Sequence, residues 1–487
     1  MAEAKSEKEI RLEKLAHLKK LGINPYPSKT PEHIVIAEAR RKKEGEKAAV
    51  VGRLTGFRGH GKATFADMED PEEKLQLFFK QDDIGGKKYE LLKLLDTGDY
   101  IWVSGEIFVT RAGELSLKVS DFQLLSKSLL PIPEGWHTLE DVESRYRQRA
   151  LDFKINKEAR EIIKKRSLII SSLRQFLDRH GFIEIQTPVL QPLYGGAAAK
   201  PFTTHYNALN ADFYLRISDE LYLKRLVVGG FERVYEICPD FRNEGLSHMH
   251  NPEFTMCEFY WAYQTHEGLM KITQEMIQEL VQKIHGSLKV TYQKQKIDFS
   301  GDFEVKKYAD IIKDETGIDI EKEKDFKSLQ AAVDKARVTF EGQKINVWSE
   351  LVDELFKKVC RPKIVQPTFV TDYPIDTAPL AKKSEQNPNI AERFQLIAAG
   401  GFELINAYSE LNDPIDQEQR FKEQVKMRDA GWEEAQVMDE NYIEALKYGM
   451  PPTAGWGMGI DRLTMILTNQ HSIKEVIPFP TLRPPKK

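Results

Sequence analysis

The clearest alternation of apolar and polar positions lies between residues 231 and 260. Residues 231–237 alternate as in a strand, the run breaks at 238–240, and a second strand begins at Pro252. This pattern predicts an antiparallel hairpin whose first strand ends before Cys238. Because side chains two positions apart share one face of a strand, one face of the second strand should carry a row of four residues: Phe254, Met256, Glu258 and Tyr260.

The side chains of this hairpin suit an anionic nucleotide and a cationic tail. Arg242 follows the first strand and can reach over the row. A bidentate cation, an aromatic ring and a buried acid in line fit a substrate with a phosphate, a flat base and a positive charge. Taken singly, Arg242, Glu244 or Glu258 is equally compatible with an ordinary hairpin and a charged loop.

Two further patterns flank this hairpin along the chain. Residues 166–179 predict an amphipathic helix, and the strand pattern of residues 181–188 ends in Pro188. Residues 455–463 predict a glycine-rich strand that leads into a helix carrying Arg462, and such glycines let a nucleotide approach the backbone closely. The G-x-G-x-G spacing without a βαβ unit excludes a dinucleotide-binding motif. The apolar face expected for the first helix consists of Leu168, Ile169, Leu173, Phe176 and Leu177.

The N-terminal part predicts a small β-barrel. Five short strand patterns occupy residues 50–57, 62–68, 74–80, 99–110 and 114–125, and their turns contain glycine. Closely spaced strands of this kind are typical of an OB-fold, which holds single-stranded nucleic acid by stacking bases on aromatic side chains. Residues 56–63 nearly fit a P-loop, but Ala63 replaces the required Ser or Thr and no helix follows. A P-loop NTPase is therefore excluded.

Composition adds only broad limits. Hydrophobic residues make up 41% and charged residues 30% of the 487 positions, and no apolar run approaches the roughly 20 residues of a membrane span. Residues 1–20 lack a signal-peptide core and are too acidic for a transit peptide, which predicts a cytoplasmic protein. Cys238, Cys257 and Cys360 form no CxxC pair, which fits a reducing compartment and indicates no zinc site.

Net charge is −4, which argues against indiscriminate nucleic-acid binding. Residues 1–50 nevertheless hold 12 Lys+Arg against 8 Asp+Glu, so the N-terminal segment is locally basic. It is either a solvated helix face or a contribution to RNA contact by the adjoining barrel.

Three segments together resemble a known family. The run FRNEG, with HNPEFT after it (residues 241–255), resembles motif 2 of the class II aminoacyl-tRNA synthetases, and in particular of their lysine-specific members. Residues 181–188 with the preceding helix resemble motif 1, which forms the dimer interface in this class, and residues 455–463 resemble motif 3. The motifs occur in the family's order, and the similarity runs from about Val50 to the C-terminus.

The resemblance implies an α+β fold, in which an OB-fold β-barrel precedes a catalytic domain with an antiparallel sheet flanked by helices. The expected organisation is a basic helical extension over 1–49, an anticodon-binding OB-fold over 50–130, a hinge over 131–149 and a catalytic domain over 150–487. Residues from about 285 to 365 are rich in lysine and glutamate and mostly helical in pattern, which indicates an insertion.

The resemblance also implies a set of site residues. Arg242, Glu244 and Arg462 are expected to be catalytic. ATP would be bound by Arg242, Glu244, His250, Asn251, Phe254, Glu403 and Arg462. Lysine would be bound by Gly196, Glu220, Arg242, Glu258, Tyr260, Asn406, Tyr408 and Glu410. Arg58, Phe65, Gln76 and Glu114 would read the anticodon, and Glu403 and Glu410 would hold Mg²⁺.

The implied activity is the ATP-dependent formation of lysyl-adenylate, followed by lysyl transfer to the terminal adenosine of tRNA(Lys). A desolvated ε-ammonium needs an anionic partner, which the glutamates supply. The implied partners are ATP, L-lysine, tRNA(Lys) and a second subunit, with no membrane. Two alternatives stay open: a related adenylating enzyme that is specific for aspartate or asparagine or modifies a protein, and an RNA-binding protein without catalysis.

Three features depart from the family pattern. Met249 stands where an arginine is usual, and Gln395 stands where a metal-binding glutamate is usual. The stretch from Gln395 to Glu403 is also one residue longer than expected. Strict alternation puts Glu403 opposite Asn406, so both can face one site only if a β-bulge lies between them.

Overall fold

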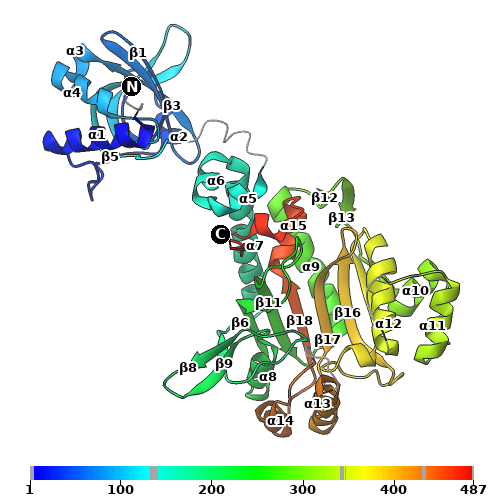
Figure 1. The fold of residues 1–487 in the computed structure, drawn as a ribbon. Helices are drawn as coiled ribbons and strands as arrows, with labels where there is room; N and C mark the ends of the chain where they lie inside the picture. Colours follow the sequence, from blue (N-terminus) through cyan, green and yellow to red (C-terminus); the bar gives the residue numbers. More distant parts are fainter. Residues whose placement is uncertain (1–4, 132–140, 341–344, 346, 430–434, 485–487) are drawn as a thin grey trace. The chain divides into compact units, whose positions relative to one another are not determined.

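The computed structural model describes residues 5–131, 141–340, 345, 347–429 and 435–484. The chain forms two compact units, Met1–Glu140 and Asp141–Lys487, and each is described by itself (Figure 1). Of the hinge expected over 131–149, residues 132–140 lie outside the described residues, whereas residues 142–147 form a short helix of the second unit. No helix in the described part of the chain is long and apolar enough to cross a membrane.

The first unit is built on a closed barrel of strand order β1-β2-β3-β5-β4. The strands are β1 (Lys47–His60), β2 (Ala63–Glu69), β3 (Lys74–Lys80), β4 (Tyr100–Val109) and β5 (Leu115–Ser126). All neighbouring pairs are antiparallel except β3 with β5. Alternate residues such as Leu75, Leu77 and Phe79 fill the interior, as period-2 patterning requires. The OB-fold prediction is confirmed.

Short helices surround this barrel. They are α1 (Glu7–Lys20), α2 (Ile36–Ala39), α3 (Gln81–Ile84), α4 (Gly86–Glu90) and the 3₁₀ turn Leu91–Leu94. Helix α1 begins with a capping box between Ser6 and Glu9, which satisfies its first free N–H groups. Its buried Leu18 joins the barrel's apolar cluster, and buried Arg11 donates a hydrogen bond to the carbonyl of Thr97. The basic N-terminal segment is thus partly packed onto the barrel.

The second unit contains an eight-stranded sheet of order β14-β15-β16-β17-β18-β11-β10-β6. The six central strands run antiparallel, whereas β14 and β6 pair in parallel at the two edges. The strands are β6 (Ile183–Glu184), β10 (Arg233–Phe241), β11 (Glu253–Ala262), β14 (Glu304–Lys307), β15 (Thr368–Pro374), β16 (Ile390–Ala398), β17 (Phe402–Ser409) and β18 (Thr453–Gly459). The fold is therefore α+β, as the sequence predicts.

Long helices cover one face of this sheet (Figure 1). Helices α7 (Lys157–Arg179), α9 (His266–His285) and α15 (Ile460–Leu467) pack against one another and against the central strands. Their apolar faces meet the inward residues of the strands, including Tyr235, Phe259 and Trp456, in the largest core cluster. Because strand side chains alternate, the intervening residues of β11 point to the opposite face of the sheet.

The opposite face carries α8 (Glu220–Val228), which packs on β10 and β11, and α14 (Glu440–Lys447), which packs on α8 and on α13 (Pro414–Asp429). A small sheet of order β7-β9-β8 precedes α8 and consists of β7 (Leu190–Gln191), β8 (Thr203–Tyr206) and β9 (Ala211–Leu215). Short helices α5 (Val142–Arg147), α6 (Arg149–Ile155) and α16 (Ile473–Val476) complete this unit near α7.

The segment around 285–365 is more mixed than its pattern indicates. It begins with the hairpin β12 (Lys289–Tyr292) and β13 (Gln295–Asp298), and β14 then joins the edge of the main sheet. Helices follow only afterwards: α10 (Tyr308–Thr316), α11 (Phe326–Lys335) and α12 (Trp348–Leu355), extended by the π-turn Phe356–Cys360. These helices form their own apolar cluster around buried residues such as Tyr308 and Leu351.

Two expectations about the central hairpin and the long helix are wrong in detail. Strand β10 does not end at Cys238 but continues to Phe241, with Pro239 opposite Thr255. Proline is tolerated there because β6 pairs only with Val234 and Tyr235, so the far edge of β10 needs no N–H at position 239. Leu168 is 37% exposed, while the other four residues expected on the apolar face of α7 are buried.

Candidate active site

A cavity of about 370 Å³ opens on the sheet face opposite α7 and α9. Its walls come from β11, β17, β18, the start of α8 and the chain that follows β10. Every residue that the sequence assigns to ATP, lysine or the metal lines this one cavity: Gly196, Glu220, Arg242, Glu244, His250, Asn251, Phe254, Glu258, Tyr260, Glu403, Asn406, Tyr408, Glu410 and Arg462. The four residues of the β11 row lie together along its wall, as expected from alternation.

A β-bulge in β17 brings Glu403 into this cavity. Leu396 of β16 lies opposite Ile405, but the next residue, Ile397, lies opposite Glu403, so Leu404 is the extra residue. The bulge shifts the alternation by one, and Glu403 therefore joins Asn406 on the cavity side. The sequence requires this bulge but does not reveal its position.

The cationic end of the cavity is formed by two arginines. The Arg242 guanidinium lies 5.0 Å from the centre of the Phe254 ring, and its Nε and Nη2 donate long hydrogen bonds to the Ile217 carbonyl. Arg462 Nη1 donates to the carbonyl of Glu403, and Nη2 lies 3.5 Å from His250 Nε2. Burial and the nearby Arg462 lower the pKa of His250 below its usual value. This end therefore favours an anion beside an aromatic plate.

The other end of the cavity is acidic and deeply buried. Glu220, Glu258 and Glu410 are each at most 7% exposed. Tyr260 donates a hydrogen bond to Glu258, and Tyr408 donates one to Glu220. In the described part of the chain, no N–H or O–H group donates a hydrogen bond to Glu410 Oε1. A buried acceptor without a donor is costly, so this oxygen is suited to a cationic ligand group.

Lys224 is a site residue that sequence reasoning missed. Its fully buried ammonium lies 2.5 Å from Glu220 Oε1 and also contacts Glu410 Oε2. Although burial favours a neutral amine, the two carboxylates raise the pKa of Lys224, so it stays charged. The i,i+4 spacing of Glu220 and Lys224 on one helix was the signal that could have found it.

Glu258 has a different environment from Glu410. Burial, with Asp240 and Glu220 nearby, raises the pKa of Glu258 to about 8. Burial also raises the pKa of Glu410, and Lys224 opposes this effect. The acidic end thus holds more carboxylates than internal cations, which favours a ligand that brings positive charge.

The two expected metal ligands, Glu403 and Glu410, have different ion-pair partners. Glu403 Oε2 is 3.6 Å from Arg361 Nη1, whereas Glu410 is held by Lys224. Within the described ranges, two groups of three side chains could hold a metal ion by themselves, and neither includes Glu403 or Glu410. A cation at Glu403 would therefore need further oxygen ligands from a bound phosphate group.

Met249 and Gln395, the two residues that depart from the family pattern, lie in different places. Met249 lines the cavity and packs in an apolar cluster with Ile473. Gln395 is paired with Asn406 across β16 and β17, and its Oε1 accepts a hydrogen bond from the Tyr373 hydroxyl at 2.7 Å. Gln395 is thus engaged by Tyr373 and is absent from the cavity lining.

The residues expected to read an anticodon lie on the first unit. Arg58 on β1 pairs with Phe65 on β2, and Gln76 on β3 pairs with Ser116 on β5. The Phe65 and Phe78 rings are 4.7 Å apart, Arg58 is ion-paired with Asp67, and Glu114 is exposed just before β5. The barrel's outer surface thus brings these four residues to one group of adjacent strands.

Comparison with known proteins agrees with this fold. A family model described as class II tRNA synthetases (D, K and N) matches residues 141–483, and a model described as an OB-fold nucleic acid binding domain matches residues 48–125. The lysine--tRNA ligase of Syntrophomonas wolfei is 47% identical over 484 residues, which cover 98% of this chain and 97% of that protein. That of Clostridium botulinum (strain Loch Maree) is 45% identical over 479 residues, with 97% and 95% covered.

The antiparallel sheet, its three motifs and the preceding barrel define a class II tRNA synthetase. The chain belongs to this family, and within it to the group of these lysine--tRNA ligases. Asp461 of the third motif joins this sheet to α7, because its carboxylate pairs with Arg166 at 3.0 Å and accepts a hydrogen bond from the Thr255 N–H.

Proposed function

We propose that this chain is a lysine--tRNA ligase, which activates L-lysine with ATP and transfers it to the 3′-terminal adenosine of tRNA(Lys). The observation that carries the specificity is the acidic end of the cavity, where buried Glu410 Oε1 lies beside Tyr260 and has no donor among the described residues. An ε-ammonium supplies both the missing donor and the opposite charge. An aspartate or asparagine side chain supplies no positive charge, so it would leave this end uncompensated.

The remaining polar groups suit the backbone atoms of an amino acid. We assign the α-ammonium to Glu220 and the backbone near Gly196, and the α-carboxylate to Asn406 and Arg242. Gly196 has φ +87°, and a Cβ there would lie 2.9 Å from Ser218 Oγ. Tyr408 lines the same pocket, and Glu258 lies beside Tyr260. The site therefore offers a donor or acceptor for each polar group of lysine.

The first chemical step then needs positioning rather than a protein nucleophile. A lysine carboxylate oxygen attacks the α-phosphorus of ATP, the bond from that phosphorus to the bridging oxygen breaks, and pyrophosphate leaves with the electron pair. Arg242 would neutralise charge on the α-phosphate, with Glu244 and Arg462 as the other catalytic residues. His250 and Asn251 would contact the nucleotide, while Phe254 and Arg462 hold the adenine.

Mg²⁺ is the metal we expect with ATP. Glu403 fits a magnesium site in chemistry and position, since it is a carboxylate at the phosphate end of the cavity. When bound, Mg²⁺ would neutralise the phosphates of ATP. That Glu410 also binds the metal stays a prediction, because Lys224 holds one of its oxygens.

We further infer that the barrel unit reads the tRNA anticodon through Arg58, Phe65, Gln76 and Glu114. The domain division follows: residues 50–130 bind the anticodon and residues 150–487 catalyse. We expect a homodimer, because apolar Leu168 on α7 and Ile183 on β6, both in the first motif, are exposed. We also expect the protein to be cytoplasmic. Light scattering after gel filtration measures the subunit number, and cell fractionation tests the compartment.

Pyrophosphate exchange tests the proposed function directly. The protein is incubated with ATP, Mg²⁺ and labelled pyrophosphate, without tRNA, in the presence of each of the twenty amino acids in turn. Exchange with lysine alone is expected. Exchange with another amino acid would retain adenylation and contradict the assignment of the acidic pocket. Absence of exchange with all twenty would contradict catalysis and favour a protein that only binds RNA.

A further inference from the structure

A second group of acids lies behind the acidic wall of the cavity. Asp219 precedes α8, Asp240 lies on β10 and Glu258 on β11, so three separate elements bring these carboxylates together. One oxygen from each lies within 4.8 Å of the others. Asp219 and Asp240 are fully buried, and Glu258 is 7% exposed and lines the cavity. The residues assigned to lysine and ATP include only Glu258 of this group.

Two oxygens of this group have no donor. Among the residues that the structure describes, no N–H or O–H reaches Asp219 Oδ1 or Asp240 Oδ2, although both atoms are buried. Their other oxygens have weak partners: the Cys238 thiol lies 3.6 Å from Asp219 Oδ2, and Arg216 Nε lies 3.5 Å from Asp240 Oδ1. Buried carboxylate oxygens in native proteins are normally satisfied, so these two atoms point to a missing cationic partner.

The neighbouring acid Glu236, by contrast, has a hydrogen-bond donor at each of its two carboxylate oxygens. Its Oε1 accepts a hydrogen bond from Arg216 at 2.7 Å, and its Oε2 accepts from the Thr187 N–H and hydroxyl. Arg216 is thus committed mainly to Glu236. Among the described residues, Arg216 forms no ion pair with Asp219 or Glu258, so it does not compensate their charge.

We propose that Asp219, Asp240 and Glu258 form a binding site for one hard divalent cation, such as Mn²⁺, Mg²⁺ or Ca²⁺. Carboxylate oxygens are the ligands these cations prefer. Oxygens on opposite sides of an ion are about 4.8 Å apart for Ca²⁺, with bonds of about 2.4 Å, and about 4.2 Å apart for Mg²⁺, with bonds of about 2.1 Å. Three oxygens within 4.8 Å of one another therefore suit Ca²⁺ directly, and the smaller ions once the side chains draw together. Because Glu258 lines the cavity, an ion can enter from there. This site shares Glu258 with the proposed lysine pocket and does not include Glu403.

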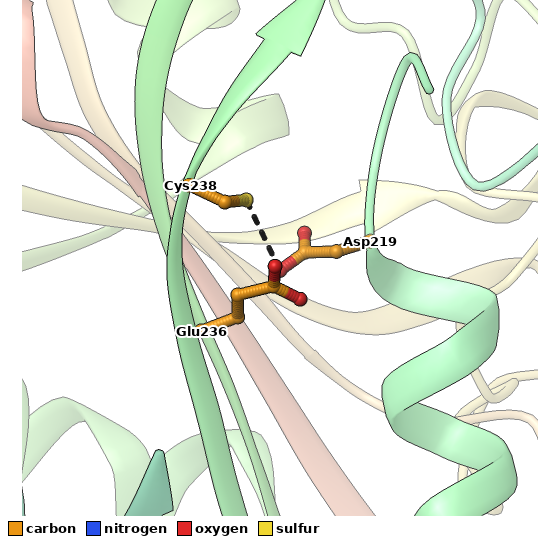
Figure 2. A group of neighbouring side chains, drawn as sticks. All are labelled: Asp219, Glu236 and Cys238. Carbon is orange, nitrogen blue, oxygen red and sulfur yellow. Dashed lines mark hydrogen bonds between the residues drawn. The ribbon is translucent and has the colours of Figure 1, made fainter. Parts of the chain in front are cut away.

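Another set of ligands overlaps with this one. Figure 2 shows Glu236 and Cys238, both on β10, facing Asp219 from the start of α8, and these three side chains also lie within 4.8 Å of one another. A thiolate and two carboxylates would suit zinc. Glu236 is already satisfied, however, and burial raises the pKa of the Cys238 thiol, so it stays protonated. The oxygen set therefore fits a cation better than the set that contains Cys238.

Protonation of these carboxylates is the alternative to a bound metal ion. Burial, with Glu258 nearby, raises the pKa of Asp219, and a proton shared between these two side chains would also reduce their repulsion. The two alternatives differ in whether the protein binds Mn²⁺ when it is stripped of metal and then titrated with this ion.

The experiment is a Mn²⁺ titration of the chelator-stripped full chain without nucleotide, followed by electron paramagnetic resonance. It is performed in the Glu403→Gln background, which removes the expected nucleotide-metal ligand. We expect one Mn²⁺ per chain. Asp219→Asn and Asp240→Asn should each weaken binding by about tenfold or more, because each removes a charged ligand while keeping the side-chain shape. Cys238→Ser is the matched control and should bind Mn²⁺ unchanged.

A second measurement needs no change at the site. Saturating Mn²⁺ or Ca²⁺ should raise the Tm of the stripped Glu403→Gln protein, since a ligand that binds only the folded state stabilises it. Three outcomes would overturn the proposal: no Mn²⁺ bound, which means that protons occupy the site; Mn²⁺ bound equally by both Asn variants; or Zn²⁺ binding that is lost in Cys238→Ser.

Discussion

Glu410 presents two oxygens with different roles. Oε2 contacts the buried ammonium of Lys224, which fixes the carboxylate, while Oε1 lies over Gly455 next to the Tyr260 ring. An internal cation therefore does not exhaust the capacity of this acid. It orients the carboxylate and favours its charged form against the effect of burial, and one oxygen stays available for a substrate ammonium.

Substitution of Glu410 by glutamine should separate the two substrates. We expect KM for lysine to rise roughly 30-fold or more, because truncating one partner of a buried charge pair costs about 2 kcal/mol or more. KM for ATP should change by less than about threefold, since the nucleotide end of the cavity is formed by other residues. Pyrophosphate exchange measures both constants. Glu423→Gln, on the exposed side of α13, is the control, and an equal loss for both substrates would contradict the assignment.

His250 should make nucleotide binding depend on pH. In the free site, burial and Arg462 hold its pKa below the usual value near 6.5, and incoming phosphates should raise it. A pKa that rises on binding means proton uptake, so affinity for ATP should increase as pH falls through this range. Calorimetry in two buffers with different ionisation enthalpies measures the uptake.

The matched comparison for this effect uses His250→Gln and His205→Gln. The first should lose the proton uptake, whereas the second alters an exposed histidine paired with Asp212 outside the cavity and should retain it. Equal uptake in the wild type and in His250→Gln would assign the proton to ATP itself.

At the scale of residues, the motifs in the sequence identify the residues that line the cavity. They do not identify the buried charged groups that contact those residues, such as Lys224. Lys224 was hidden because a lysine in a helix is usually solvated. The alternation places Cys238 and Asp240 only at a strand break, and it assigns no role to Asp219. The burial of Cys238 and Asp240 follows from the continuation of β10 through Pro239, which no local pattern indicates.

At the scale of elements, β17 and β18 shape the pocket by backbone features. The bulge at Leu404 turns Glu403 towards the cavity, and the glycines of β18 leave room on the same face. A Cβ on Gly455 would lie 1.9 Å from Glu410 Oε1 and 2.6 Å from Tyr260 Cε1. A Cβ on Gly457 would make only ordinary contacts, the nearest at 3.5 Å from Glu258 Cγ. The two glycines thus have different steric roles.

This difference predicts the outcome of a matched pair of substitutions. Gly455→Ala should reduce lysine-dependent exchange by about 100-fold or more, because the methyl group displaces the side chains that receive the ammonium. Gly457→Ala should retain exchange within about tenfold. Exchange kinetics and the Tm of both variants are measured together. Similar losses in the two variants, at similar Tm, would contradict the view that the space above Gly455 is the lysine pocket.

Most elements could be predicted because their patterns are strong. The barrel strands, the hairpin, α7 and the glycine-rich strand before Arg462 all follow from periodicity. The failures lie where tertiary context overrides the local pattern: Pro239 is tolerated since the edge of β10 is unpaired there, and β12 to β14 form strands within a segment rich in lysine and glutamate. A β-bulge is required for Glu403 and Asn406 to face one site, but only the observed pairing of β16 with β17 places it at Leu404.

At the scale of the molecule, the two units divide the proposed reaction. The acidic cavity lies entirely in the second unit, and Arg58, Phe65 and Gln76 lie on neighbouring strands of the first. Each unit has its own apolar core, so a change on the barrel surface need not disturb the adenylation site. The two half-reactions should therefore respond separately to substitutions in each unit.

Phe65→Ala tests this separation. Phe65 is half-buried on the outer surface of the barrel, where its ring packs beside Phe78, and a base stacked on such a ring contributes roughly 1–3 kcal/mol. We expect kcat/KM for charging of tRNA(Lys) to fall by about tenfold or more, while lysine-dependent exchange stays unchanged, because exchange does not use tRNA. Tyr100→Ala removes another exposed ring, on β4, which covers Arg53, and should leave charging intact. A loss of exchange with Phe65→Ala would instead mean that this ring has a structural role.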